Sequence, residues 1–147
     1  RKRLLTTLCY ALLDPRNREL LYASAGHLFP YVVSTGGAVR ALESVAYPLG
    51  VRGHLQVEPR RVVLDPGDCL FLFSDGLVEA RRTDGSGAGA GGDQFGFQRL
   101  EESLQRHAGA GVEGLRDGVL ADVERFAGRG PREDDQTLLV LRLPADG

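Results

Sequence analysis

The chain contains no methionine and no tryptophan, and only two of its 147 residues are cysteine. Without a Cys-x-x-Cys pair or a Cys/His cluster, nothing in the sequence indicates a zinc site. Cys9 and Cys69 both lie in apolar, strand-like runs, which is typical of buried small side chains in a protein of the reducing cytoplasm. No apolar run approaches the roughly 20 residues that cross a bilayer, so we expect no membrane insertion.

An excess of either charge is also missing. The 18 Lys and Arg residues nearly balance the 20 Asp and Glu residues, which leaves a formal net charge of -2. No basic block stands out, so binding to nucleic acid or to an anionic membrane is not expected. Hydrophobic residues make up 42% of the chain, enough for a single domain over residues 1–147 with a real core. Because the chain opens on Arg1 and has no initiator methionine, we interpret it as a fragment of a larger polypeptide.

The order of the predicted elements is strands, then two helices, then a last strand. Apolar runs predict strands over residues 4–13, 19–24, 28–33, 38–42, 54–64 and 69–73, and the first two form a hairpin around the turn 14–17. A glycine-rich stretch, 82–94, is expected to be a flexible loop. Helical spacing predicts helices over 96–107, with Phe97, Leu100 and Leu104 on the buried face, and over 112–126. With a final strand over 136–143, this order predicts an α+β layered domain.

Carboxylates stand at the ends of two of these strands. The apolar strand 69–73 runs into Ser74, Asp75 and Gly76, and Asp134 and Asp135 come just before the last strand. Asp-Gly is a common turn pair, and adjacent acidic residues are often solvated loop charges. However, a carboxylate at the end of a buried strand is costly unless it is paired or holds a metal, and neighbouring carboxylates repel unless a cation intervenes. If the fold brings the two positions together, they indicate a divalent-cation site and phosphate chemistry.

A single histidine stands in the predicted turn between two strands. His27 follows Ala25 and Gly26. A lone histidine in such a turn is more often a hydrogen-bonded structural residue than a ligand, because a metal site needs further donors that the turn does not supply. We therefore interpret Gly26 and His27 as a structural motif.

Four segments, in this order, resemble one family of enzymes. They are ASAGHLFP at 23–30, PLG at 48–50, LDPGDCLFLFSDGLVEA at 64–80 and DDQTLLVLR at 134–142. They are similar to the NAGHxPP, PLG, LxPGDxLxLYTDGLxEA and DDxTLLVLR segments of the SpoIIE-type branch of the PPM metal-dependent serine/threonine phosphatases, found in bacterial sigma-factor regulators. The resemblance covers nearly the whole chain.

The resemblance implies a PPM-type αββα sandwich, in which two antiparallel sheets lie between helical layers. It also implies two Mn²⁺ or Mg²⁺ ions in a complete site, held mainly by aspartates and sharing an activated water; hard dications prefer such oxygen ligands. Asp75 and Asp134 match the family's ligands of one metal. Gly76 and Asp135 match positions beside that ion that do not bind it.

The chain departs from the family at its N-terminal side. The family's GGDxxD and DVxGHG blocks, which supply the aspartate shared by both metals, are absent. The resemblance therefore implies an incomplete sandwich with one partial metal site. The parent protein is expected to be a cytoplasmic phosphatase with an upstream sensor domain, acting on a phosphorylated STAS-type anti-sigma-factor antagonist. Two alternatives stay open: a non-catalytic, truncated phosphatase-like module that binds a regulatory partner, and an α+β ligand-binding domain whose aspartates only form turns.

Overall fold

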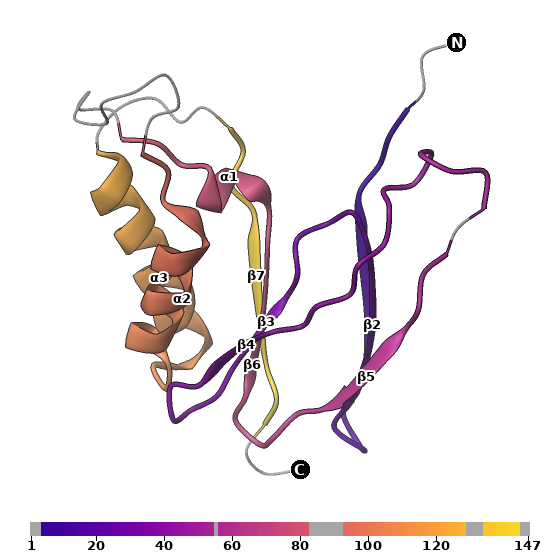
Figure 1. The fold of residues 1–147 in the computed structure, drawn as a ribbon. Coiled ribbons are helices and arrows are strands. Elements are labelled where there is room, and N and C mark those ends of the chain that lie inside the picture. The colour runs from indigo at the N-terminus through magenta and orange to yellow at the C-terminus, as the bar shows by residue number, and fades with distance from the viewer. Residues whose placement is uncertain (1–3, 55, 83–92, 129–133, 145–147) are drawn as a thin grey trace.

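A computed structural model describes residues 4–54, 56–82, 93–128 and 134–144 of the chain. The described residues form two antiparallel sheets and a layer of helices (Figure 1). In chain order the elements are β1 (Leu8–Asp14), β2 (Glu19–Ala25), β3 (Tyr31–Val33), β4 (Val39–Ala41), β5 (Arg60–Val63), β6 (Cys69–Phe73), α1 (Asp75–Val78), α2 (Gly96–His107), α3 (Gly111–Ala127) and β7 (Leu138–Arg142). One sheet has the order β1-β2-β5 and the other β4-β3-β6-β7.

The predicted hairpin is confirmed. β1 and β2 pair antiparallel from Leu8 opposite Ala25 to Asp14 opposite Glu19. The turn between them is closed by Asp14, whose carboxylate accepts hydrogen bonds from the backbone N–H of Arg16 and the side-chain amide of Asn17, both at 2.9 Å. This is the local bonding that makes aspartate favourable at the start of a turn.

β6 is a largely buried strand at the centre of the second sheet. It pairs antiparallel with β3 on one side and with β7 on the other, and Phe71 at its centre is fully buried. An unbroken apolar run suits a strand that is covered on both faces. Because Phe73 is opposite Leu138, the end of β6 and the beginning of β7 lie side by side.

Helices α2 and α3 cover one face of the β4-β3-β6-β7 sheet (Figure 1). Leu100 and Leu104 of α2 are buried as predicted, but Phe97 is 49% exposed. Phe95, just before the helix, is buried in the core instead of Phe97. It is 3% exposed and makes an edge-on contact with Phe126 of α3 at 5.6 Å between ring centroids.

A second core fills the space between the two sheets, with Leu20 and Tyr22 of one sheet packed against Val32 and Leu70 of the other. Among the described residues no helix covers the outer face of the β1-β2-β5 sheet, and apolar side chains remain exposed there. These are Leu8, Tyr10, Leu12 and Val63. The structure therefore has the two sheets and one of the two helical layers of the expected sandwich. The α+β fold class is confirmed.

Several predicted strands are shorter or shifted in the structure: the strand predicted over 28–33 is reduced to β3, and the one predicted over 4–13 begins only at Leu8. The strand predicted over 54–64 is reduced to β5, four residues long, because only that part pairs with β2. The glycine-rich loop predicted over 82–94 falls mostly on residues 83–92, which lie outside the described part of the chain; at its two ends Arg81 and Gln94 form an isolated antiparallel bridge. None of the described helices is long and apolar enough to cross a membrane.

Candidate metal centre

Asp75 stands directly beyond the buried end of β6. The chain leaves the sheet at Ser74 and at once forms the single-turn helix α1, whose residues Leu77 and Val78 are buried. The sequence had indicated only a turn here. The buried side of α1 anchors the segment, while Asp75 itself is exposed, and one of its carboxylate oxygens accepts a hydrogen bond of 3.1 Å from the backbone N–H of Gly76.

The Asp134–Asp135 segment lies alongside because the pairing of β6 with β7 continues past the strands. The backbone N–H of Ser74 donates to the carbonyl of Thr137 at 2.9 Å. The Ser74 hydroxyl accepts a hydrogen bond from the Thr137 N–H at 2.9 Å and donates to the carbonyl of Asp135 at 3.2 Å. One serine therefore joins the two acidic segments, although about sixty positions separate them in the sequence.

Gly76 is packed against the same segment. A Cβ atom built on Gly76 would lie less than 3.0 Å from the Asp135 carbonyl oxygen, closer than real Cβ atoms approach. The Gln136 side-chain amide closes the contact by donating to the Gly76 carbonyl at 3.1 Å. The glycine at this position is thus required by the close approach of two backbones.

Gln136 is a site residue that the sequence reasoning missed. Its side-chain carbonyl oxygen is the one buried side-chain polar atom without a hydrogen-bond partner among the described residues. A buried oxygen in that condition loses roughly 1–3 kcal/mol of solvation. No pattern in the sequence separates Gln136 from an ordinary residue at the start of a strand, and only the packing against Gly76 reveals it.

The residues fit a hard divalent cation in type but supply few ligands. Asp75, Asp134 and Asp135 are exposed carboxylates, the kind of ligand that Mg²⁺ and Mn²⁺ take. The carboxylate of Asp134 is oriented by a 2.8 Å hydrogen bond from the N–H of Asp135. Within the described ranges no group of three or more His, Cys, Asp or Glu side chains is close enough together to hold an ion. The assignment of Asp75 and Asp134 as ligands stays a prediction.

Gly26 and His27 lie in a different contact. Gly26 has a positive φ of 71° and faces Pro48, so that an added Cβ would approach the proline ring to less than 3.0 Å. His27 lies with its Nδ1 3.5 Å from the Thr7 hydroxyl, and its carbonyl accepts a 2.8 Å hydrogen bond from Ser24. None of these contacts involves Asp75 or Asp134. The first and second of the family-like segments therefore meet each other, in keeping with a structural motif.

The two antiparallel sheets and the helical layer match the fold of PP2C-type phosphatase domains. The chain belongs to the SpoIIE family: the family model "Stage II sporulation protein E (SpoIIE)" matches residues 1–144.

Several known proteins are similar along most of the chain. Protein IcfG of Synechocystis is 28% identical over 107 residues, which are 73% of this chain and 16% of that protein. The SiaA-PP2C domain of Pseudomonas aeruginosa has 26% identity and a TM-score of 0.76, over 92% of this chain and 51% of that one. The RsbU and RsbW domains of a Mycobacterium tuberculosis protein have 29% identity and a TM-score of 0.74, over 95% of this chain and 36% of that one.

A more distant structure shares the fold. It is the phosphatase domain of Bacillus subtilis SpoIIE, presoaked with manganese, with 18% identity and a TM-score of 0.70 over 96% of this chain and 58% of that one. The chain thus spans about half the length of the SiaA domain, little more than a third of the mycobacterial chain and a smaller share of IcfG.

Proposed function

We propose that this chain is part of a metal-dependent protein serine/threonine phosphatase that hydrolyses phosphoserine or phosphothreonine on a regulatory protein. The observation that carries the proposal is the bonding of Ser74 to Asp135 and Thr137, which puts the carboxylates of Asp75 and Asp134 on two adjacent segments at one end of the sheet. Membership of the SpoIIE family supports the chemistry.

In this proposal Asp75 and Asp134 hold a Mn²⁺ or Mg²⁺ ion. A bound dication of this kind supplies an activated water and neutralises charge on the phosphoryl group. The chain's own contribution is rigidity. Ser74 fixes the distance between the two acidic segments, Gly76 allows them to approach, and the hydrogen bond from the Asp135 N–H sets the orientation of the Asp134 carboxylate.

The identity of the substrate is a further part of the proposal. The relatives include RsbU and SpoIIE domains, so we expect a phosphorylated STAS-type anti-sigma-factor antagonist in the cytoplasm as partner. Because the chain covers only part of these relatives, the substrate and the sensor domain belong to the whole protein rather than to the residues described.

The test is Mn²⁺-dependent hydrolysis of p-nitrophenyl phosphate and of a phosphoserine peptide by the 147-residue chain. Asp75→Asn and Asp134→Asn should each remove the Mn²⁺-dependent activity. Asp117→Asn is the matched control, since Asp117 is an exposed aspartate of α3 whose carboxylate, among the described residues, is bonded to its neighbour Arg116. Activity that persists in both site variants would refute the assignment of the ligands.

A second candidate is favoured by the absence of a three-ligand cluster among the described residues. Two carboxylates hold a dication weakly, and a water that is not positioned reacts slowly. In this alternative the chain is a non-catalytic module that binds a regulatory partner. It predicts no hydrolysis and no rise in melting temperature on addition of Mn²⁺. A Mn²⁺-induced rise that is lost in Asp75→Asn would instead indicate a real, incomplete metal site.

A further inference from the structure

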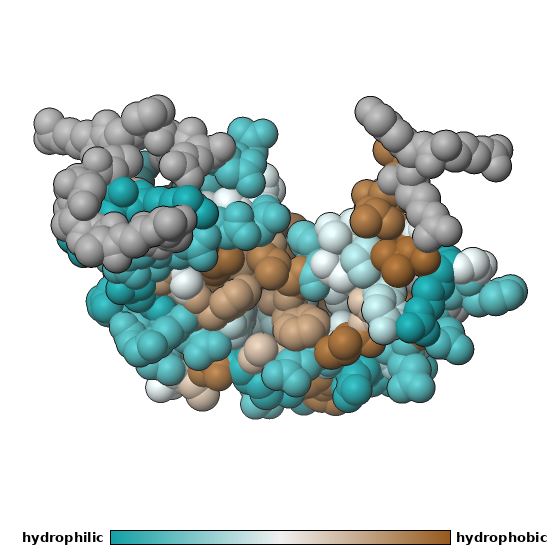
Figure 2. Space-filling view, turned by 45° about the horizontal axis from the view of Figure 1, so that its top comes forward, coloured by the Kyte–Doolittle hydropathy of each residue, from teal (hydrophilic) through white to brown (hydrophobic). Residues whose placement is uncertain are grey.

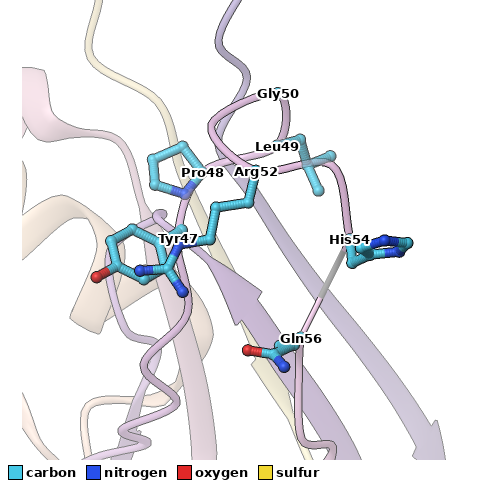
Figure 3. Close-up of a pocket in the computed structure, with 7 residues that line it drawn as sticks. All are labelled: Tyr47, Pro48, Leu49, Gly50, Arg52, His54 and Gln56. Carbon is cyan, nitrogen blue, oxygen red and sulfur yellow. The ribbon is translucent and has the colours of Figure 1, made fainter.

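A small pocket opens in the loop between β4 and β5, outside the candidate metal centre (Figure 3). Its empty space, including the part open to solvent, is about 360 Å³. It is lined by Tyr47, Pro48, Leu49, Gly50, Arg52, His54 and Gln56. This loop contains the PLG segment, whose role the proposed function does not explain.

The walls of the pocket are fixed by contacts with other parts of the chain. Leu49 exchanges two backbone hydrogen bonds with Thr6, at 2.8 and 3.1 Å. Pro48 packs against Gly26, and Gly50 lies so close to the Leu4 carbonyl that a Cβ atom there would have no room. The backbone of the loop is therefore tied at three successive residues, and such preorganisation lowers the entropy cost of binding a ligand. The side chains of Arg52 and Gln56, which follow, are exposed and accessible to a ligand.

The polar groups of the pocket are suited to an anion. The Arg52 guanidinium carbon lies 4.0 Å from the centroid of the Tyr47 ring, a cation–π contact that orients the planar guanidinium. Figure 3 shows the Gln56 amide on the same side of the loop, whereas His54 points away. Among the residues that the structure describes, no carboxylate forms an ion pair with Arg52. Its fork of N–H donors matches a carboxylate in two-point geometry.

The pocket lies at the same end of the molecule as the candidate metal centre. In Figure 1 the loop rises beside the upper end of β2, and α1, which carries Asp75, stands at the upper end of the other sheet. Figure 2 shows this end hollowed between the helical side and the β1 side, with apolar residues in the hollow. A peptide lying in that hollow would pass from one site to the other, advancing about 3.3–3.6 Å per residue.

We infer that this pocket binds an acidic side chain of the phosphorylated protein substrate, several residues away from the phosphoresidue, through the guanidinium of Arg52. The inference rests on the proposed phosphatase function and adds a determinant of substrate choice. Arg52 is a specificity residue here and not a catalytic one, because it lies in a pocket outside the candidate metal centre.

The test measures binding without metal, so that it does not depend on catalysis. The ¹⁵N-labelled chain is titrated with a phosphoserine peptide that carries glutamates several residues to either side of the phosphoserine, and with the same peptide carrying glutamines at those positions. We expect the amide resonances of Arg52 and Gln56 to shift with the glutamate peptide. We also expect it to bind about fivefold more tightly than the glutamine peptide, the effect of one exposed charge pair.

Three variants decide the outcome. Arg52→Gln should abolish the preference for glutamate, and Arg52→Lys should keep only part of it, because lysine retains the charge without the planar fork. Arg16→Gln removes the same charge from an exposed position in the β1–β2 turn and should leave the preference intact. Equal binding of the two peptides to the wild type, or equal losses in Arg52→Gln and Arg16→Gln, would overturn the inference.

Different results would overturn the phosphatase function and the role of Arg52. A glutamate preference that depends on Arg52, in a chain with no Mn²⁺-dependent hydrolysis, would support this pocket and count against phosphatase activity. Mn²⁺-dependent hydrolysis that responds to Asp75→Asn, with no glutamate preference, would support the phosphatase and overturn the role of Arg52.

Discussion

Gly76 and the backbone carbonyl of Asp135 are in contact with no space for a side chain between them. Gly76→Ala should therefore force the α1 and β7 segments apart and destabilise the protein by about 1–3 kcal/mol, the usual cost of overpacking. Urea unfolding measures the change. Gly53→Ala is the control, because nothing lies within 4 Å of the Cβ position at Gly53, and it should be close to neutral. Equal stability of the two variants would show that the two backbones are not held together in solution.

From the hydrogen bonds of Ser74 we expect stability and metal binding to be linked. Ser74→Ala removes a donor to the Asp135 carbonyl and an acceptor for the Thr137 N–H, which should cost about 1–2 kcal/mol. Because the Asp134 segment then loses its anchor, the rise in melting temperature on addition of Mn²⁺ should also shrink. Ser34→Ala removes one hydroxyl bond, to the N–H of Ala38, in a turn away from this site. Its Mn²⁺ response should match the wild type; a reduced response there would disconnect the effect from Ser74.

The contact between Gly26 and Pro48 predicts energetic coupling between the two positions. Gly26→Ala adds strain from the positive φ and a clash with the proline ring, together about 2 kcal/mol or more. Pro48→Ala in the same chain should recover part of this loss, which a double-mutant cycle by urea unfolding measures. Gly96→Ala isolates the backbone strain, because Gly96 also has a positive φ but nothing within 4 Å of its Cβ position. Strict additivity of the first two substitutions would contradict the contact.

From the environment of Asp122 we expect the stability of the helical layer to fall in acid. Burial alone would raise the pKa of this carboxyl, but hydrogen bonds from Ser103, Arg125 and His107, with the charge of Arg106, lower it to about 2. The folded pKa lies below the unfolded value of about 3.9, so the stabilisation is complete above pH 4 and is lost as the pH falls through 2. It should amount to about 1–2 kcal/mol at neutral pH, since the arginine partners are exposed.

Asp122→Asn should flatten the acid limb of the stability profile between pH 2 and 4, measured by urea unfolding at several pH values. Glu58→Gln, a change at an exposed loop carboxylate, is the control and should leave the limb unchanged. If both variants kept the wild-type profile, the network around Asp122 would not be formed in solution.

The elements of the fold follow from local patterns in the sequence. β6 and α2 have the predicted bounds because an unbroken apolar run and a helical spacing are complete within one segment. Phe97 shows the limit of such patterns. It continues the spacing of Leu100 and Leu104, yet Phe95 is buried instead, because its N–H is bonded to the Ala80 carbonyl and its ring meets Phe126. These partners come from distant parts of the chain, so no local period contains them.

The candidate site was likewise predictable from the sequence only in part. The aspartates at positions 75, 134 and 135 and their places next to predicted strands can be read from the sequence. The register of β6 with β7 then puts them on adjacent segments. The unpaired oxygen of Gln136 and the meeting of Gly26 with Pro48 depend on how backbones approach one another in space. Residue type alone carries no sign of these approaches.

Because the two sheets are covered unequally, we expect them to differ in local opening. Backbone amides exchange with solvent at a rate set by the local free energy of opening, which is lowest where few apolar contacts lie over the strands. The β4-β3-β6-β7 sheet lies between the helices and the inter-sheet core, whereas β1, β2 and β5 have exposed side chains on one face. Amide exchange should therefore be slow along β6 and fast along β1, so that the strand from which Asp75 projects belongs to the last part of the molecule to unfold.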